Sequence, residues 1–206
     1  MGKVHVDMSK SLDGFVAGPN AGPHNAIGDG GHRIQQWMYD VESWRERQSL
    51  QGGQANQDDE VSKERFARTG AYVMGRRMFD EGEVGWPDPP PFRAPVFVLT
   101  HQAREPWDRQ GGTTFTFVTE GIESALEQAR AAAGEKDIQI SGGAAIVRQF
   151  IEAGMLEELQ IHLAPVLLGG GVRLFDRIDT EDAVELEVTR VIDSPRVTHL
   201  RYRVVK

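Results

Sequence analysis

The sequence contains no cysteine among its 206 residues. This absence excludes disulfide bonds, thiol nucleophiles and thiolate metal ligands. No apolar run approaches the length of a membrane span, and the first residues, MGKVHVDMS, lack the hydrophobic region of a signal peptide. Positive charge is also scarce, because 23 Lys and Arg residues stand against 31 Asp and Glu residues and the net charge is −8. We therefore expect no nucleic-acid and no membrane partner, and we predict a cytoplasmic protein.

The remaining composition, 39% hydrophobic and 26% charged, is that of a globular protein. A chain of this length can bury a substantial core, so we predict a single domain over residues 1–206. Strand patterns at 4–9, 71–74, 96–99, 115–118, 137–141 and 159–163 alternate with helix patterns at 32–47, 58–67, 121–133 and 146–151. Residues 184–204 have the pattern of a hairpin that turns at 193–195. This order predicts an α/β fold with a central, mostly parallel mixed sheet, helices on both faces and a C-terminal antiparallel hairpin.

The first predicted strand has one apolar and one polar face, because Val4, Val6 and Met8 alternate with His5 and Asp7. A long loop rich in turn residues follows it, and loops of this length in compact domains are often functional. The next helix pattern forms one apolar stripe from residue 32 to residue 47, and we expect this helix to lie over the loop.

Residues 136–154, KDIQISGGAAIVRQFIEAG, read as a strand, a glycine pair and a helix. Gly142 and Gly143 allow a tight turn, and Gly154 stands where a left-handed helix cap is expected. Free N–H groups and the positive end of the helix dipole meet just after Gly143, which favours an anion such as phosphate. Close packing of the strand against the helix explains the same glycines, so the two interpretations remain open at this point.

Polar or glycine-containing segments follow three of the predicted strands: Gly75-Arg76-Arg77, Thr100-His101 and Ser141-Gly142-Gly143. Ligands of such sheets bind beyond the carboxyl ends of the parallel strands. Arginines can hold one phosphate while the glycine turn takes a pyrophosphate, and this combination predicts NADPH. A solvated helix start explains the two arginines equally well. No GxGxxG follows the first strand, which argues against a standard Rossmann dehydrogenase.

Five segments together carry a resemblance to a known family. They are SLDGFVAGPNA at 11–21, YVMGRRMFD at 72–80, VFVLTH at 96–101, ISGGAAIVRQF at 140–150 and LAPVLLGGGVRLF at 163–175. In this order they resemble the dihydrofolate reductase-like superfamily, and most closely its branch typified by the reductase (RibD C-terminal) domain of riboflavin biosynthesis. The resemblance spans nearly the whole chain. It implies a dihydrofolate reductase-like three-layer fold and a homodimeric, NADPH-dependent reductase.

The resemblance also implies which residues bind the cofactor. The loop after the first strand would border the nicotinamide, the Gly-Arg and Thr-His segments would surround the adenosine 2′-phosphate, and the glycine turn would hold the pyrophosphate. The positions that match are Val16, Ala17, Gly75, Arg76, Arg77, Thr100, His101, Ser141, Gly142, Gly143, Ala144 and Ile146. Asp13 matches as well, but a role in forming the Leu-Asp-Gly turn is favoured over catalysis.

The chain departs from dihydrofolate reductases at the first helix, where those enzymes carry a carboxylate. Ile34 stands near that position, and Asp29, Asp40 and Glu42 are only neighbours of it. The catalytic residues therefore stay unassigned, and the proton is expected from water or from an unidentified acid. The six histidines show no metal-ligand spacing, so no metal is predicted, and most are interpreted as ordinary strand or loop residues. The absence of cysteine also excludes the zinc deamination of the fused riboflavin enzymes.

Three functions remain open. The favoured one is NADPH-dependent hydride transfer to a small heterocyclic or carbonyl-type substrate, related to 5-amino-6-(5-phosphoribosylamino)uracil reductase and dihydrofolate reductase. The second is a non-catalytic dimeric NADP-binding protein, and the third is a structural interaction domain. Trp86 is predicted to line a pocket or a dimer contact, whereas Trp37, Trp44 and Phe66 are predicted to pack a core.

Overall fold

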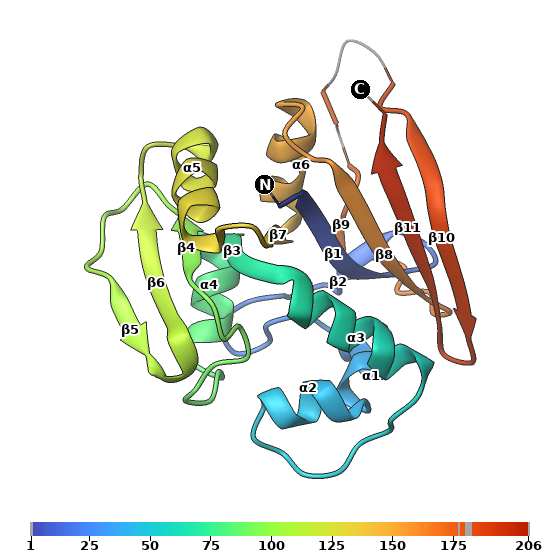
Figure 1. Cartoon of the computed structure of the whole chain (residues 1–206). Helices are drawn as coiled ribbons and strands as arrows, with labels where there is room; N and C mark the ends of the chain where they lie inside the picture. The colour runs from blue at the N-terminus through green and yellow to red at the C-terminus, as the bar shows by residue number, and fades with distance from the viewer. Residues whose placement is uncertain (1, 177, 180–182, 206) are drawn as a thin grey trace.

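The computed structural model describes residues 2–176, 178–179 and 183–205. These residues form a nine-stranded mixed sheet in the order β10-β11-β8-β1-β7-β3-β4-β6-β5 (Figure 1). Six neighbouring strands are parallel: β8 (Glu158–Ala164), β1 (Val4–Ser11), β7 (Asp137–Gly142), β3 (Thr69–Gly75), β4 (Val96–Leu99) and β6 (Thr113–Val118). Antiparallel strands flank them: β11 (Val197–Val204), followed by β10 (Leu186–Ser194), at one edge and β5 (Trp107–Arg109) at the other. A separate pair joins β2 (Phe15–Ala17) to β9 (Val172–Arg173).

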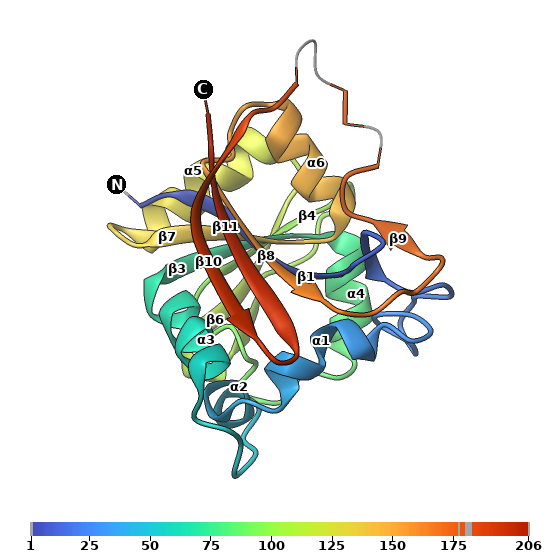
Figure 2. The same cartoon turned by 90° about the vertical axis from the view of Figure 1, so that its right-hand side faces the viewer.

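Helices cover both faces of the large sheet, as Figure 2 shows. One face carries α5 (Ile122–Ala133) and α6 (Ala144–Glu152). The opposite face carries α1 (His32–Tyr39), α2 (Glu42–Arg47), α3 (Gln57–Arg68) and α4 (Arg76–Glu83). The predicted α/β architecture, including the C-terminal hairpin, is confirmed. Among the residues described, every helix is too short or too polar to span a bilayer.

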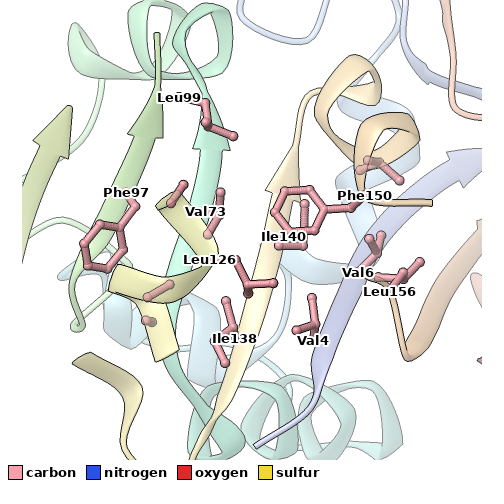
Figure 3. Close-up of a cluster of buried hydrophobic side chains, with 14 of the residues drawn as sticks. Val4, Val6, Val73, Phe97, Leu99, Leu126, Ile138, Ile140, Phe150 and Leu156 are labelled. Carbon is pink, nitrogen blue, oxygen red and sulfur yellow. The ribbon is translucent and has the colours of Figure 1, made fainter. Parts of the chain in front are cut away.

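The main core lies between the sheet and the pair α5 and α6 (Figure 3). Alternate residues of neighbouring strands point into it, such as Val6 of β1, Val73 of β3 and Ile140 of β7, and Phe150 of α6 packs against them with no exposed surface. We call this the apolar face of the sheet. Its burial supplies most of the hydrophobic stabilisation, because apolar area removed from water is the dominant favourable contribution to folding.

The opposite face of the central strands carries polar side chains, and we call it the polar face. The alternation in β1 predicts that one face of this strand is polar. In the structure, α1 and α3 bury this polar face. The cause is the central position of β1, since both faces of an inner strand of such a sheet are covered. The buried polar side chains of β1, β7, β8 and β11 are His5, Asp7, Ser9, Ser11, Gln139, Ser141, Glu158, Gln160, His162 and His199.

Two local predictions are wrong. The single helix expected over residues 32–47 is two helices, because Val41 adopts an extended backbone (φ −85°, ψ 148°), is fully buried and bridges Gln54. The predicted hairpin is present, and Leu186 and Val188 on its strand β10 are 42% and 56% exposed. They lie on the strand at the outer edge of the sheet (Figure 1). The first strand also continues two residues beyond its predicted end, to Ser11.

Candidate functional site

The three strand-end segments singled out in the sequence come together at one edge of the sheet. Gly75 ends β3, Ser141 and Gly142 end β7, and Thr100 and His101 follow β4 directly. Since β7, β3 and β4 are parallel neighbours, their carboxyl ends meet there. A cavity of about 530 Å³, which we call the strand-end cavity, opens beside them. Its lining includes Arg76, Asp80, Thr100, His101, Ile146 and Gln149.

The two adjacent arginines lie in different surroundings. Arg76 lines the strand-end cavity, and its Nε donates to Asp80 Oδ1 at 2.7 Å, which leaves its terminal nitrogens without a partner among the described residues. Arg77 is absent from that lining, and it donates to Glu81 on its own helix and to the backbone oxygen of Ala21 in the long loop. The structure thus separates two residues that the sequence treated as one element.

The turn between β7 and α6 leaves its backbone open to a ligand. Gly142 has a φ of +109°, a conformation that favours glycine. A methyl group built on Gly143 would meet no atom within 4 Å, so the surface there is unobstructed. The first N–H groups of α6 have no acceptor within the helix. Gly75 differs, because a methyl group there would lie 2.8 Å from Ile146 Cγ1, and close packing explains this glycine.

The predicted nicotinamide loop forms β2, where Val16 is buried and Ala17 pairs with Val172 of β9. Gly171 lies against this strand so closely that a methyl group on it would lie 2.1 Å from the Ala17 oxygen. Asp13 fixes the same region, since its carboxylate accepts from Ser11 Oγ and from the backbone N–H groups of Leu168 and Gly169. These bonds, the Ser11 contact first, lower the pKa of Asp13 to about 2. The interpretation of Asp13 as a turn former agrees with these contacts.

A second cavity of about 260 Å³ lies between the polar face and the helices α1 and α3, and we call it the aromatic cavity. Trp86 lines it, as one of its two predicted roles requires. Trp44 and Phe66, predicted to pack a core, line it too, whereas Trp37 is buried as expected. Aromatic rings dominate this lining: Tyr39, Trp44, Phe66, Tyr72, Trp86 and Phe92.

A carboxylate reaches the aromatic cavity from the sheet rather than from the first helix. Asp7 of β1 lines the cavity, and its Oδ1 accepts from Arg65 Nη1 at 3.2 Å. Burial alone would raise the pKa of Asp7, but His162 and Arg65 lower it well below its ordinary value. The carboxylates considered near Ile34 have other surroundings, since Asp29 bonds Asn20 and Asn25, and Asp40 pairs with Arg196.

Two histidines also form part of this site, although the sequence gave no reason to pair them. His162 Nε2 lies 3.0 Å from Asp7 Oδ1, and His162 Nδ1 lies 2.6 Å from His199 Nδ1. His199 Nε2 in turn lies 3.0 Å from Asp58 Oδ1 in the first turn of α3. Both histidines are strand residues, as the sequence predicted for most histidines, but they also form a buried network with two carboxylates. The available signal was their alternation with apolar residues in two strands, His162 in ELQIHLA and His199 in VTHLRYRV.

Comparison with known proteins gives consistent relatives. Two proteins of Bacillus subtilis named as uncharacterized are similar: YyaP is 24% identical over 93% of this chain and 90% of YyaP, and YwjB is 27% identical over 57% of this chain and 65% of YwjB. Among solved structures, a protein of Shewanella sp. PV-4 assigned to riboflavin biosynthesis superposes with a TM-score of 0.67 at 22% identity over the full length of both chains. Dihydrofolate reductase from Enterococcus faecalis, complexed with NADP(H) and RAB-propyl, gives 0.57 at 15% identity over 100% of this chain and 98% of its own.

The structural likenesses show the fold, which is the dihydrofolate reductase-like three-layer architecture expected from the sequence. The family description that matches is the RibD C-terminal domain, and the match extends over residues 2–200, nearly the entire sequence. The chain belongs to the RibD C-terminal domain family.

Proposed function

We propose that this protein is an NADPH-dependent reductase of a small planar heterocycle, acting as a single domain and as a homodimer. Membership of the RibD C-terminal domain family supports a reductase-type function. The bound cofactor would supply a hydride, and the chain's own residues would bind it, orient it and keep water away. The related activities are those of 5-amino-6-(5-phosphoribosylamino)uracil reductase and dihydrofolate reductase.

One observation carries the proposal: the β7–α6 turn takes part in both cavities. Ser141 lines the aromatic cavity, and Ile146, five residues later, lines the strand-end cavity. A long ligand laid across Gly142 and Gly143 would therefore reach both cavities at once. A dinucleotide has this form, with an aromatic ring at one end and phosphates in the middle and at the other.

The residues present fit such a ligand. The open backbone at Gly143 and the first N–H groups of α6 suit a pyrophosphate, because a helix N-terminus attracts anions. Arg76 would hold the 2′-phosphate with the terminal nitrogens that its bond to Asp80 leaves available. Thr100 and His101 line the same cavity. We propose these residues, with Val16 and Ala17 at the nicotinamide end, as the cofactor site.

The aromatic cavity supports a flat, heteroatom-rich substrate. Its aromatic walls suit a planar ring, and a few buried polar groups among them can fix the orientation of that ring. Ser141 Oγ is buried and has no hydrogen-bond partner among the described residues. A buried hydroxyl without a partner is unfavourable, so a ligand that bonds to it gains affinity.

The cofactor assignment is tested by titrating NADPH and NADH with fluorescence detection. Arg76→Ala should weaken NADPH binding about tenfold and leave NADH binding unchanged, since one charge-assisted contact is lost. Arg77→Ala is the matched control, and it should bind NADPH as the wild type does because Arg77 lies outside the strand-end cavity. Equal affinity of the wild type for both cofactors would contradict the 2′-phosphate site.

Turnover separates the reductase from the alternative, a non-catalytic dimeric NADP-binding protein. NADPH consumption should be followed with dihydrofolate, with ribosylaminopyrimidine phosphates, and with simple quinones and carbonyls. Oxidation of NADPH with one of these substrates supports the reductase. Tight cofactor binding with no oxidation across the panel favours the binding protein.

The homodimer is also a proposal, and the exposed side of β10 supports it. Leu186, Val188 and Val191 are between 42% and 57% exposed on this edge strand. Exposed apolar side chains on a sheet edge are typical of surfaces that pair with another chain. Sedimentation of the wild type and of Val188→Lys would test it, since the variant should shift the population toward monomer.

A further inference from the structure

A continuous hydrogen-bonded chain runs from the aromatic cavity into the protein: Asp7, His162, His199 and Asp58. Its three contacts measure 3.0, 2.6 and 3.0 Å, and each joins a side-chain oxygen or nitrogen to the next ring. All four side chains are buried, and none of these four residues is more than 8% exposed. They come from four different elements, β1, β8, β11 and α3.

The three contacts fix the number of protons in the chain. Each hydrogen bond needs one proton between its two atoms, so the chain holds three. Two ionised carboxylates and two neutral imidazoles would hold only two, one on each ring. The chain therefore carries one additional proton, and its total charge is −1 whether that proton sits on a ring or on a carboxyl group.

The surroundings suit a proton that can move. Arg65 is the cation that faces Asp7, and together with His162 it lowers the pKa of that carboxyl group. Burial first and then His162 lower the pKa of His199. His5 and Tyr72 also face this region, and burial lowers the pKa of His5 to about 4, so it stays neutral. The Trp37 ring covers both imidazoles at 4.5 and 4.9 Å between centroids.

Only one end of the chain opens to the aromatic cavity. Asp7 and His162 are part of its lining, whereas His199 and Asp58 are not. Both hydrogen bonds of Asp7 use Oδ1, and Oδ2 has no partner among the described residues. Oδ2 is thus the atom that a ligand nitrogen in the cavity can meet.

We propose that Asp7 is the acid of the reduction and that His162, His199 and Asp58 hold and replace its proton. The inference rests on the proposed reductase function. The bound cofactor would supply the hydride that forms the new C–H bond of the substrate and would itself be oxidised, and the hydrogen-bonded chain supplies the proton of the new N–H bond. The proton passes from His162 Nε2 to Asp7 Oδ1, and rotation of the carboxyl group then carries it to the side of the cavity, where the substrate nitrogen takes it. The chain then has a charge of −2 and regains one proton from water.

The proton count is testable without cofactor or substrate. In ¹⁵N-labelled protein at neutral pH, ring ¹⁵N NMR reports which histidine nitrogens carry hydrogen. We expect three protons on the four nitrogens of His162 and His199, and a neutral His5 ring as the internal control. Two protons on the pair, with the Asp7 and Asp58 carboxyl groups both ionised in the side-chain ¹³C spectrum, would overturn the proposal. Asp58→Asn should lower the count from three to two, because its amide N–H can donate to His199 Nε2.

Access from the cavity is tested with 2-aminopyridine, a basic planar heterocycle, followed by tryptophan fluorescence. Asp7→Asn should weaken its binding about tenfold, since a charge-assisted bond becomes a neutral one. Unchanged affinity would remove Asp7 from the cavity chemistry. Asp40→Asn is the matched control, because Asp40 pairs with Arg196 outside the cavity. Neither measurement uses NADPH. If both give the expected result and the protein does not bind NADPH, the proposed reductase function is contradicted and the proton chain is not.

On a substrate found by the turnover panel, Asp58→Asn should lower kcat and move the alkaline fall of activity to lower pH. KM and the NADPH affinity should stay within about twofold of the wild type, because Asp58 touches neither ligand cavity. A merely structural role would leave the pH profile unchanged. That result, together with a normal proton count in the wild type, would also overturn the proposed delivery of the proton.

Discussion

The two faces of the central sheet are built from the same strands and differ in almost every other respect. In β7, Ile138 and Ile140 point to the apolar face, whereas Gln139 and Ser141 point to the polar face. The first face packs against α5 and α6 in one continuous core. The second lies under α1 and α3 and borders the aromatic cavity. The period of two in a strand thus separates the part that stabilises the fold from the part that can do chemistry.

The difference has an energetic side. Burial of the apolar face is favourable without any specific partner, because the hydrophobic effect has no direction. Burial of the polar face is tolerable only where each group finds a partner, and the Asp7–His162–His199–Asp58 chain provides partners for four groups. Ser141 Oγ remains without one among the described residues. The polar face therefore contributes less to the free energy of unfolding than a fully paired one would, which is common for binding sites.

The largest expected effect is on the apolar face. Phe150→Ala should lower the free energy of unfolding by about 3–5 kcal/mol, because a fully buried ring is replaced by a cavity. Urea unfolding measures the change. Ile138→Val, at a buried position of the same face, is the graded control and should lower the free energy by about 1 kcal/mol. A loss under 1 kcal/mol for Phe150→Ala would show that this core repacks freely.

On the polar face, Asp7→Asn should lower the free energy of unfolding by about 2 kcal/mol at neutral pH, since Asp7 loses a charge that two partners stabilise. The folded pKa of Asp7 lies below its unfolded value of about 3.9. The stabilisation is therefore complete above that value, and it is lost as the pH falls through the folded pKa. Unfolding curves of both proteins should converge only in strong acid. Convergence already near pH 6 would contradict an ionised, stabilised Asp7.

Much of the fold was accessible from the sequence because its signals are local. The strand that ends at Ser141, the glycine turn and the helix closed by Gly154 lie in one stretch, and their periods and cap survive in the structure. The strand end at Leu99 was found in the same way, and the strand predicted to end at Met74 continues by one residue to Gly75. Parallel strands then bring these ends together without further information.

The proton chain was not accessible, because its contacts depend on strand order. Asp7 and His162 are 155 residues apart, and they meet only because β1 pairs with β8. His162 faces His199 because β8 also pairs with β11 in that register. The carboxylates near Ile34 in the sequence surround the first helix, whereas Asp7 reaches the cavity from the first strand.

Substitutions of two glycines at the same edge of the sheet should distinguish a role in packing from a role in ligand binding. Gly75→Ala should lower the free energy of unfolding by about 1 kcal/mol, because its methyl group would press on Ile146. Gly143→Ala meets no atom in the protein, so the methyl group should instead obstruct NADPH and weaken its binding about tenfold. Unfolding and NADPH titration of both variants test the pair. A reversal of the two effects would contradict the proposed cofactor path.

The smallest effect on stability belongs to Ser141→Ala, and its sign is informative. The wild-type hydroxyl is buried without a partner, so its removal should change the free energy of unfolding by less than about 0.5 kcal/mol or raise it slightly. Ligand binding should respond in the opposite sense, because a ligand in the aromatic cavity loses the hydroxyl that Ser141 offers there. Thermal unfolding with and without NADPH measures both. If the variant is destabilised and its ligand affinity is unchanged, Ser141 stabilises the fold and does not bind the ligand. At this position the polar face would then have the same structural role as the apolar face.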